Sequence, residues 1–212
     1  MRTATTWQRR FLMHAINADL LPVKTKHTRA ATLLLTLLAS ITTLALDLQN
    51  LNVTKEGRTY KIRMTFNITS SPDKVMAILT DYSFPDRLNP KVTARQIISL
   101  QNGITRVRTE IQSCVFVFCK DVALIQDVTI IANTIQADIV PDKSDFRSGT
   151  LRWSVTSGDD GGSQIAFDAN MEPDFFIPPL IGGYFVRKQL RQEILATAQR
   201  LEIEAKQESD HE

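Results

Sequence analysis

The side chains that most often carry out acid–base and nucleophilic chemistry are scarce in this 212-residue chain. Its three histidines, His14, His27 and His211, lie near the two termini, and none falls between residues 46 and 210. Ser-His-Asp catalysis, Cys-His catalysis and histidine-rich metal sites are therefore excluded from the body of the chain. No two carboxylates are spaced as a general acid and base would be. We predict no catalytic residue, no metal and no cofactor, and a binding protein rather than an enzyme.

The two cysteines, Cys114 and Cys119, are the next candidates for chemistry. In one continuous strand their Cα atoms would be about 17 Å apart, whereas a disulfide needs about 5.5 Å. The stretches 104–112 and 120–130 both alternate like strands, so a hairpin turn between them would bring the cysteines face to face. We predict a disulfide here, with two buried thiols as the alternative. A C-x4-C pair without further Cys or His is weak evidence for zinc.

The tip of this hairpin is apolar, because Val115, Phe116, Val117 and Phe118 occupy it. Exposed apolar clusters usually mark contact with a membrane or a partner. We predict that Phe116 and Phe118 make transient contact with a membrane surface. In the alternative, the tip folds over and plugs one end of the domain.

Residues 1–46 have the pattern of an export signal. Residues 30–46 form a run of 17 uncharged residues, preceded by a basic region and followed by Asp47. This order, ending in small residues, is typical of a signal peptide, and Thr43-Leu44-Ala45 offers a cleavage site. We therefore predict export to the periplasm or cell envelope. An uncleaved membrane anchor and a buried helix are the alternatives.

The distribution of charge separates this segment from the rest of the chain. Residues 1–46 carry six basic side chains and one acidic one, whereas residues 47–212 carry 19 basic and 22 acidic side chains. The body is mildly acidic, so no basic face for nucleic acid is evident. The basic region is long for a signal, which leaves both Met1 and Met13 open as the start.

Beyond an extended lead-in at 48–57, the chain alternates with the period of β-strands. Residues 60–69 form the first strand, after which Ser71 and Pro72 begin a short helix. The stretch 85–90 permits a second short helical turn. Further strands are predicted at 92–100, 104–112, 120–130, 134–139, 149–156 and 164–171. The short turns between them, such as Asn102-Gly103, indicate an antiparallel meander.

The last element is a long helix over 179–205. Val186, Leu190, Ile194, Ala198 and Leu201 recur at helical spacing, with charged residues between them. Its 27 residues would span about 40 Å, enough to cross a sheet. Residues 207–212 are predicted to be a disordered tail.

Three motifs carry a resemblance to a known superfamily. They are the first-helix stretch 71–82 (SPDKVMAILTDY), the strand passage 146–153 (FRSGTLRW) and the helix entry 173–185 (PDFFIPPLIGGYF). With this order of elements, the chain resembles the START-like superfamily of polyketide cyclases, coenzyme Q-binding proteins and lipid-transfer domains. The resemblance implies an α+β helix-grip fold, with a curved seven-stranded antiparallel sheet gripping the C-terminal helix and two short helices after the first strand. The domain would occupy residues 47–206.

The resemblance also implies an apolar cavity between sheet and helix. The residues expected to line it are Trp153, Phe175, Phe176, Gly183, Tyr184 and Phe185; ordinary core packing is the alternative for the aromatic side chains. We expect the protein to bind a hydrophobic ligand such as a lipid or an isoprenoid quinone in the cell envelope, with binding alone and transport both left open. A cyclase or aromatase using the same cavity, and an envelope interaction protein with a collapsed cavity, are the alternatives.

Overall fold

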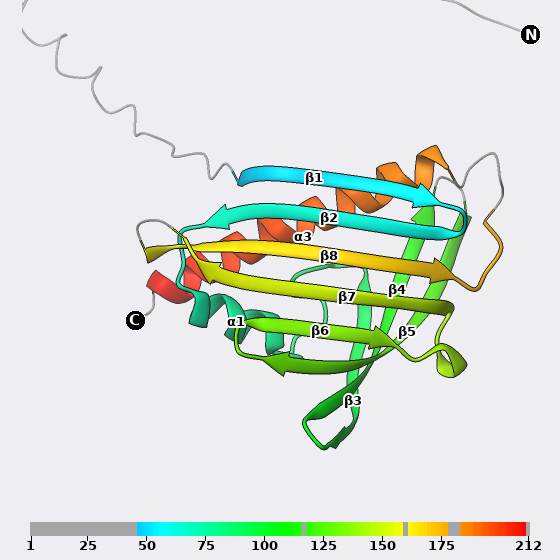
Figure 1. Ribbon diagram of the computed structural model, residues 1–212, viewed down its shortest axis with the longest axis horizontal. Coiled ribbons are helices and arrows are strands. Elements are labelled where there is room, and N and C mark those ends of the chain that lie inside the picture. The colour runs from blue at the N-terminus through cyan, green and yellow to red at the C-terminus, as the bar shows by residue number, and fades with distance from the viewer. Residues whose placement is uncertain (1–45, 116–117, 159–160, 178–182, 211–212) are drawn as a thin grey trace, which may run out of the picture. The chain divides into compact units, whose positions relative to one another are not determined.

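The computed structural model describes residues 46–115, 118–158, 161–177 and 183–210. These residues form one eight-stranded antiparallel sheet in the order β1-β2-β8-β7-β6-β5-β4-β3 (Figure 1). The strands are β1 (Asp47–Glu56), β2 (Thr59–Ile68), β3 (Val92–Gln101), β4 (Ile104–Val115), β5 (Phe118–Ile131), β6 (Thr134–Ile139), β7 (Phe146–Ser157) and β8 (Ser163–Pro173). Two α-helices, α1 (Pro72–Thr80) and α3 (Tyr184–Asp210), and a short 3-10 helix, η1 (Pro141–Lys143), complete the described part. Sheet and long helix together confirm the helix-grip fold.

The core lies between one face of this sheet and the two α-helices. In β2 every second side chain, from Tyr60 to Ile68, is buried, as a half-covered strand requires. Met64 and Phe66 have no exposed surface, and Ala198, Leu201 and Ala205 of α3 are equally buried in the same cluster. Each large side chain buried in this way contributes about 1.5–3 kcal/mol. The C-terminal half of α3 is therefore the part of the helix that packs most closely against the sheet. We call the face of the sheet that the helices cover the inner face.

The hairpin between β4 and β5 confirms the prediction for the cysteines. Cys114 and Cys119 lie directly opposite each other in the register and form a disulfide, with their Cα atoms 4.0 Å apart. Residues 116–117 lie outside the described residues. The other predicted hairpin turn is also present, since Asn102 and Gly103 both have positive φ, 53° and 77°.

Two predicted features are wrong. The lead-in at 48–57 is a strand, β1, which pairs with β2 along its whole length, so the sheet has eight strands and not seven. Leu51 is the one buried side chain of β1, and the apolar alternation there is correspondingly weak. The second short helix at 85–90 is absent: Val92 N donates to Asn89 O (3.0 Å) and Lys91 N to the Asn89 side chain (3.0 Å), both in turns rather than a helix.

The ends of the long helix also differ from the expectation. The described part of the helix begins at Tyr184, with Gly183 just before it, and residues 178–182 lie outside the described residues. At the other end α3 continues to Asp210, through most of the predicted tail. No helix in the described ranges is long and apolar enough to span a membrane.

Candidate functional site

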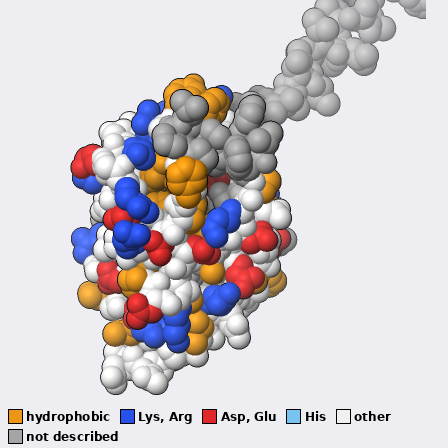
Figure 2. All heavy atoms as spheres, turned by 90° about the vertical axis from the view of Figure 1, so that its right-hand side faces the viewer, with side chains coloured by type: hydrophobic (Ala, Val, Ile, Leu, Met, Phe, Trp, Pro, Cys, Tyr) orange, Lys and Arg blue, Asp and Glu red, His pale blue; other side chains and the backbone are white. Residues whose placement is uncertain are grey.

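A pocket of about 510 Å³ opens at one end of the sheet. It lies where the β1–β2 hairpin, the start of β7, the end of β8 and the approach to α3 come together, at the right-hand end of Figure 1. Figure 2 views this end directly and shows hydrophobic side chains flanked by lysines, arginines and acidic residues. The described lining residues are Lys55, Arg58, Tyr60, Arg147, Pro173, Asp174, Phe175, Phe176, Ile177 and Gly183.

The wall formed by Phe175 is held firmly. After β8 ends at Pro173, Asp174 N donates to Asp145 O (2.9 Å), which turns the chain toward β7. The Phe175 ring then meets Phe146 edge to face, with 6.2 Å between ring centroids, and the Lys120 ammonium lies 5.2 Å from its centroid. Phe176 is different, because 82% of its surface is exposed. Phe175 therefore forms a fixed wall of the pocket, whereas the side chain of Phe176 is exposed to solvent at the mouth of the pocket.

Three cations surround this apolar wall. Arg58 donates to Pro173 O (3.2 Å) and pairs with Glu172, whereas Arg147 pairs with Asp174 at 2.6 Å. The Lys55 ammonium lies 5.9 Å from the centroid of the Tyr60 ring. Burial raises the pKa of the Tyr60 phenol, partly opposed by Arg187. The phenol therefore stays neutral near pH 7, and the one carboxylate among the described lining residues, Asp174, is paired with Arg147.

The predicted lining residues divide into three groups. Phe175, Phe176 and Gly183 lie in the pocket. Tyr184 and Phe185 begin α3 with their rings 5.4 Å apart and remain 63% and 42% exposed. Trp153 lies inside the domain, with its ring 4.4 Å from that of Phe167. Phe116 lies outside the described residues, as does the side chain of Phe118, so their membrane contact stays a prediction.

A second polar group lies on the inner face, at the other edge of the sheet. Arg95 of β3 pairs in register with Thr109 of β4, whose side chain is buried, and its guanidinium carbon lies 5.9 Å from the Tyr82 ring centroid. Tyr82 packs on the apolar cluster of Val107, Val128, Ile135 and Ala137, which fixes Arg95 on that same inner face. Burial lowers the pKa of Arg95 and raises the pKa of the Tyr82 phenol.

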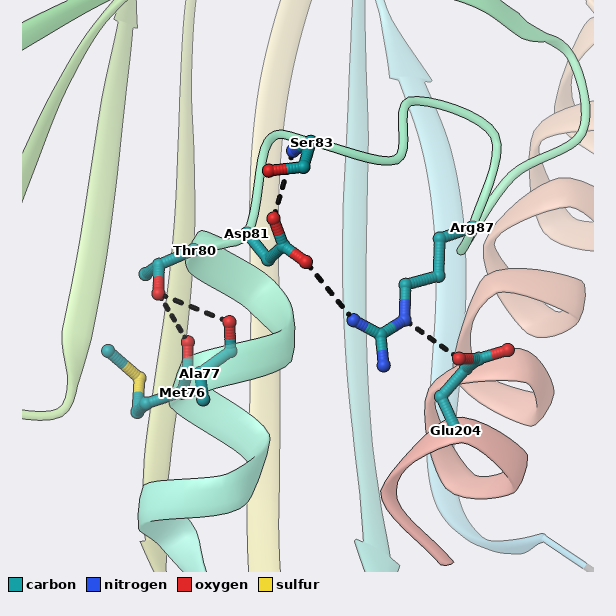
Figure 3. Close-up of polar contacts among 7 residues, drawn as sticks. All are labelled: Met76, Ala77, Thr80, Asp81, Ser83, Arg87 and Glu204. Carbon is teal, nitrogen blue, oxygen red and sulfur yellow. Dashed lines mark hydrogen bonds and ion pairs between the residues drawn. The ribbon is translucent and has the colours of Figure 1, made fainter. Parts of the chain in front are cut away.

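Hydrogen bonds and ion pairs made by Asp81 and Arg87 hold the segment that carries Tyr82 in place (Figure 3). The Asp81 carboxylate accepts from Ser83 N (2.9 Å) and from Arg87 (3.3 Å), and Arg87 also donates to Glu204 of α3 at 2.7 Å. The hydrogen bond from the Ser83 backbone, before all else, holds the pKa of Asp81 below its ordinary value. Arg87 therefore joins the end of α1 to the end of the long helix.

The sequence prediction missed both Arg95 and the cationic rim. A β-bulge between Val92 and Ala94 shifts the alternation of β3, so that Val92 and Arg95, three residues apart, share the inner face. Strict alternation from Val92 would have turned Arg95 outward. The rim residues Lys55 and Arg58 come from the β1–β2 hairpin, whose first strand the prediction did not contain.

Two arginines of β4 lie on the outer face of the sheet. Arg106 pairs with Asp127 through two hydrogen bonds of 2.6 and 2.7 Å, and Arg108 pairs with Glu110. These are partly exposed ion pairs, which contribute little stability. Within the described ranges, no group of three His, Cys, Asp or Glu side chains is placed to hold a metal ion.

Comparison with known proteins identifies the class to which this fold and pocket belong. The sequence profile of the family described as polyketide cyclase/dehydrase and lipid transport matches residues 59–205. The chain belongs to this family, within the START-like superfamily. No curated protein matches the chain.

Solved structures share the fold at low sequence identity. A START superfamily protein from Mycobacterium smegmatis is 18% identical with a TM-score of 0.57, covering 69% of this chain and 97% of its own. The Zhui aromatase/cyclase from Streptomyces sp. R1128 is 13% identical with a TM-score of 0.57, covering 70% and 94%. A STAR-related lipid transfer protein from Xanthomonas axonopodis is 15% identical with a TM-score of 0.53, covering 71% and 98%. At these identities the likeness shows the fold alone.

Proposed function

We propose that this protein binds a hydrophobic small molecule, such as a lipid or an isoprenoid quinone, and carries it in the cell envelope. The observation that supports this proposal is the pocket of about 510 Å³ between the end of the sheet and the approach to α3. Its size is that of a small-molecule site, for which roughly 300–1,000 Å³ is usual. Membership of a family described by lipid transport points the same way.

The driving force for binding is the removal of apolar surface from water. Phe175, Phe176 and Ile177 supply an apolar wall, and each Å² buried against it contributes about 25 cal/mol before the cost of ordering the ligand. Lys55, Arg58 and Arg147 stand at the rim of this apolar wall. Such a site binds and releases its ligand without changing it.

The test of this site is Gly183→Leu, with Gly183→Ala as the matched control. A Cβ on Gly183 meets no atom within 4 Å, so the position accepts a side chain, and leucine adds bulk beside the pocket. We expect Gly183→Leu to weaken the binding of a fluorescent hydrophobic probe about tenfold and to leave the melting temperature unchanged. The alanine variant should bind as the wild type does. Equal probe binding by the folded leucine variant would remove the pocket from the proposal.

The bound molecule itself is best identified from its natural source. Native mass spectrometry and solvent extraction of the protein purified from its own host should yield one class of lipid or quinone. Recovery of a chemically altered polyketide would instead favour the second candidate function, a cyclase-type enzyme. One observation favours that candidate: Arg95 and Tyr82 place ionisable groups on the inner face.

Export and membrane docking belong to the same proposal. The signal-like residues 30–46 would direct the chain to the envelope, and N-terminal sequencing should find cleavage near Ala45. The disulfide would shape the tip that presents Phe116 and Phe118 to a bilayer. A Phe116→Ser/Phe118→Ser variant should then sediment less with liposomes than the wild type. Equal sedimentation would separate the tip from membrane contact.

A further inference from the structure

We propose that Arg95, together with Tyr82 and Gln126, binds the anionic head group of an amphiphile, a carboxylate or a phosphate. The inference rests on the proposed function, because it names the chemical class of the hydrophobic ligand. It assigns the head group to the inner face at β3–β5, and none of these three residues lines the pocket near Phe175.

The charge of Arg95 favours an anionic ligand. In the part of the chain that the structure describes, this half-buried guanidinium has a tyrosine ring beside it but no carboxylate, and burial lowers its pKa without removing its charge. Two arginines of the outer face do have carboxylate partners, since Arg106 pairs with Asp127 and Arg108 pairs with Glu110. A desolvated cation without a counter-ion costs free energy. A bound carboxylate or phosphate would remove that cost through paired hydrogen bonds.

The second argument is the side chain of Gln126. Its Nε2 atom is buried and has no hydrogen-bond partner among the described residues. Gln126 pairs in register with Val107, two residues before Thr109, the cross-strand partner of Arg95. The amide and the guanidinium therefore lie on the same face, on β5 and β3 with β4 between them. Buried donors are usually satisfied, so an unpaired donor on the same face as an unpaired cation indicates an acceptor supplied by a ligand.

The third argument is the position of Tyr82. Its segment is held by the Asp81–Arg87–Glu204 bridge, so the ring stays over Arg95 without being ordered by the ligand (Figure 3). Burial raises the pKa of its phenol, which therefore remains a hydrogen-bond donor at neutral pH. A ring and a guanidinium fixed in advance reduce the ordering cost of binding.

The surroundings favour an amphiphile over a small anion. Ile97 lies two residues from Arg95, and Leu100 and Ile130 follow on the inner-face positions of the neighbouring rows. All three remain 48–70% exposed although they are large aliphatic side chains. An aliphatic chain lying on them would bury this surface while its head group meets Arg95.

The experiment compares three ligands with the same oleyl chain and different heads. Oleic acid, oleoyl lysophosphatidic acid and oleyl alcohol are titrated into the full-length chain below their micelle concentrations. A Trp7→Phe background leaves Trp153, which packs in the same apolar cluster as Tyr82, as the reporter of binding. The variants are Arg95→Gln, Gln126→Leu and a control, Arg152→Gln, which removes an outer-face arginine.

We expect the wild type and Arg152→Gln to bind at least one of the two acids about tenfold or more tightly than the alcohol. Arg95→Gln should lose this preference while binding the alcohol unchanged, and Gln126→Leu should lose part of it. The acid that binds more tightly identifies carboxylate or phosphate as the natural head. The melting temperature of unliganded Arg95→Gln should not fall, because the variant removes an unpaired charge. If this variant does not fold, Arg95→Lys replaces it and should keep a reduced preference.

Three outcomes overturn the inference. Equal affinity of the wild type for acids and alcohol, or an acid preference that survives in Arg95→Gln, refutes the assignment and leaves the proposed function intact. Failure of all three ligands to bind refutes the proposed function, and the assignment with it.

Discussion

Gly149 provides a sharp test of how closely the sheet is packed. It lies in β7 opposite Met171 of β8, on the inner face. A Cβ at this position would stand 2.6 Å from the backbone oxygen of Asn170 and 2.6 Å from Cδ1 of Ile139. Two of its three nearest neighbours are backbone atoms, Asn170 O and Met171 Cα (3.2 Å), and the third is the Ile139 side chain. Since backbone in a paired strand cannot rotate away, Gly149→Ala must open the β7–β8 ladder locally.

The expected cost follows from two opposing effects. Overpacking of this kind destabilises a protein by about 1–3 kcal/mol. Replacing glycine by alanine restricts the unfolded chain and returns roughly 0.5–1 kcal/mol. The midpoints of these two ranges leave a net loss of about 1 kcal/mol, which in a chain of this length lowers the melting temperature by about 2–4 °C.

The measurement is thermal unfolding followed by circular dichroism. Gly183→Ala is the control, because a Cβ there meets nothing within 4 Å and should leave the melting temperature within about 2 °C. A Gly149→Ala variant as stable as this control would show that β7 and β8 are not packed as described. Close strand contact would then not be what requires a glycine at position 149.

Two further predictions concern the disulfide and an acidic group. Cys114→Ser/Cys119→Ser removes a bond that closes a short loop, so unfolding should become easier by about 2 kcal/mol; an unchanged denaturant midpoint under oxidising conditions would show that the register already supplies the constraint. Hydrogen bonds lower the pKa of Asp81 in the folded state. The ionised Asp81 carboxylate therefore stabilises the folded protein fully above the unfolded pKa of about 3.9, and this contribution is lost as pH falls through the folded pKa. Asp81→Asn should therefore be less stable than the wild type at pH 6 and equally stable near pH 2; a stability gap that persists at pH 2 would assign the effect to the amide itself.

The parts of the fold that the sequence predicts are those governed by local rules. Alternation from Tyr60 to Ile68 predicts β2, Asn102-Gly103 predicts a turn with positive φ, and two strand-like stretches around Cys114 and Cys119 predict the disulfide. Each of these signals is complete within about ten residues. β1 is not predicted because it is an edge strand in which Leu51 is the one buried side chain. Its sequence therefore has almost no alternation of apolar and polar residues to detect.

The candidate sites are harder to predict because they depend on contacts between distant segments. The pocket brings together residues from the β1–β2 hairpin, from β7 and from the end of β8. Some of them are more than 110 positions apart in the sequence, as Arg58 and Pro173 are. The aromatic cluster Phe175–Phe176 could be found, since it follows a strand and precedes a proline pair. Its cationic rim could not, because it depends on which hairpin lies beside it.

The group around Arg95 shows why departures from local rules matter in this fold. Most of the inner face obeys strand alternation with apolar side chains, and the outer arginines Arg106 and Arg108 pair with carboxylates. At β3–β5 three departures occur together: a bulge that turns Arg95 inward, a guanidinium without a carboxylate, and the buried, unpaired amide of Gln126. A purely structural role for Arg95 would be expected to provide it with a counter-ion, as the chain does for Arg106. Since exceptions to local rules are retained chiefly where function requires them, their coincidence at one place argues that the missing partner is the ligand.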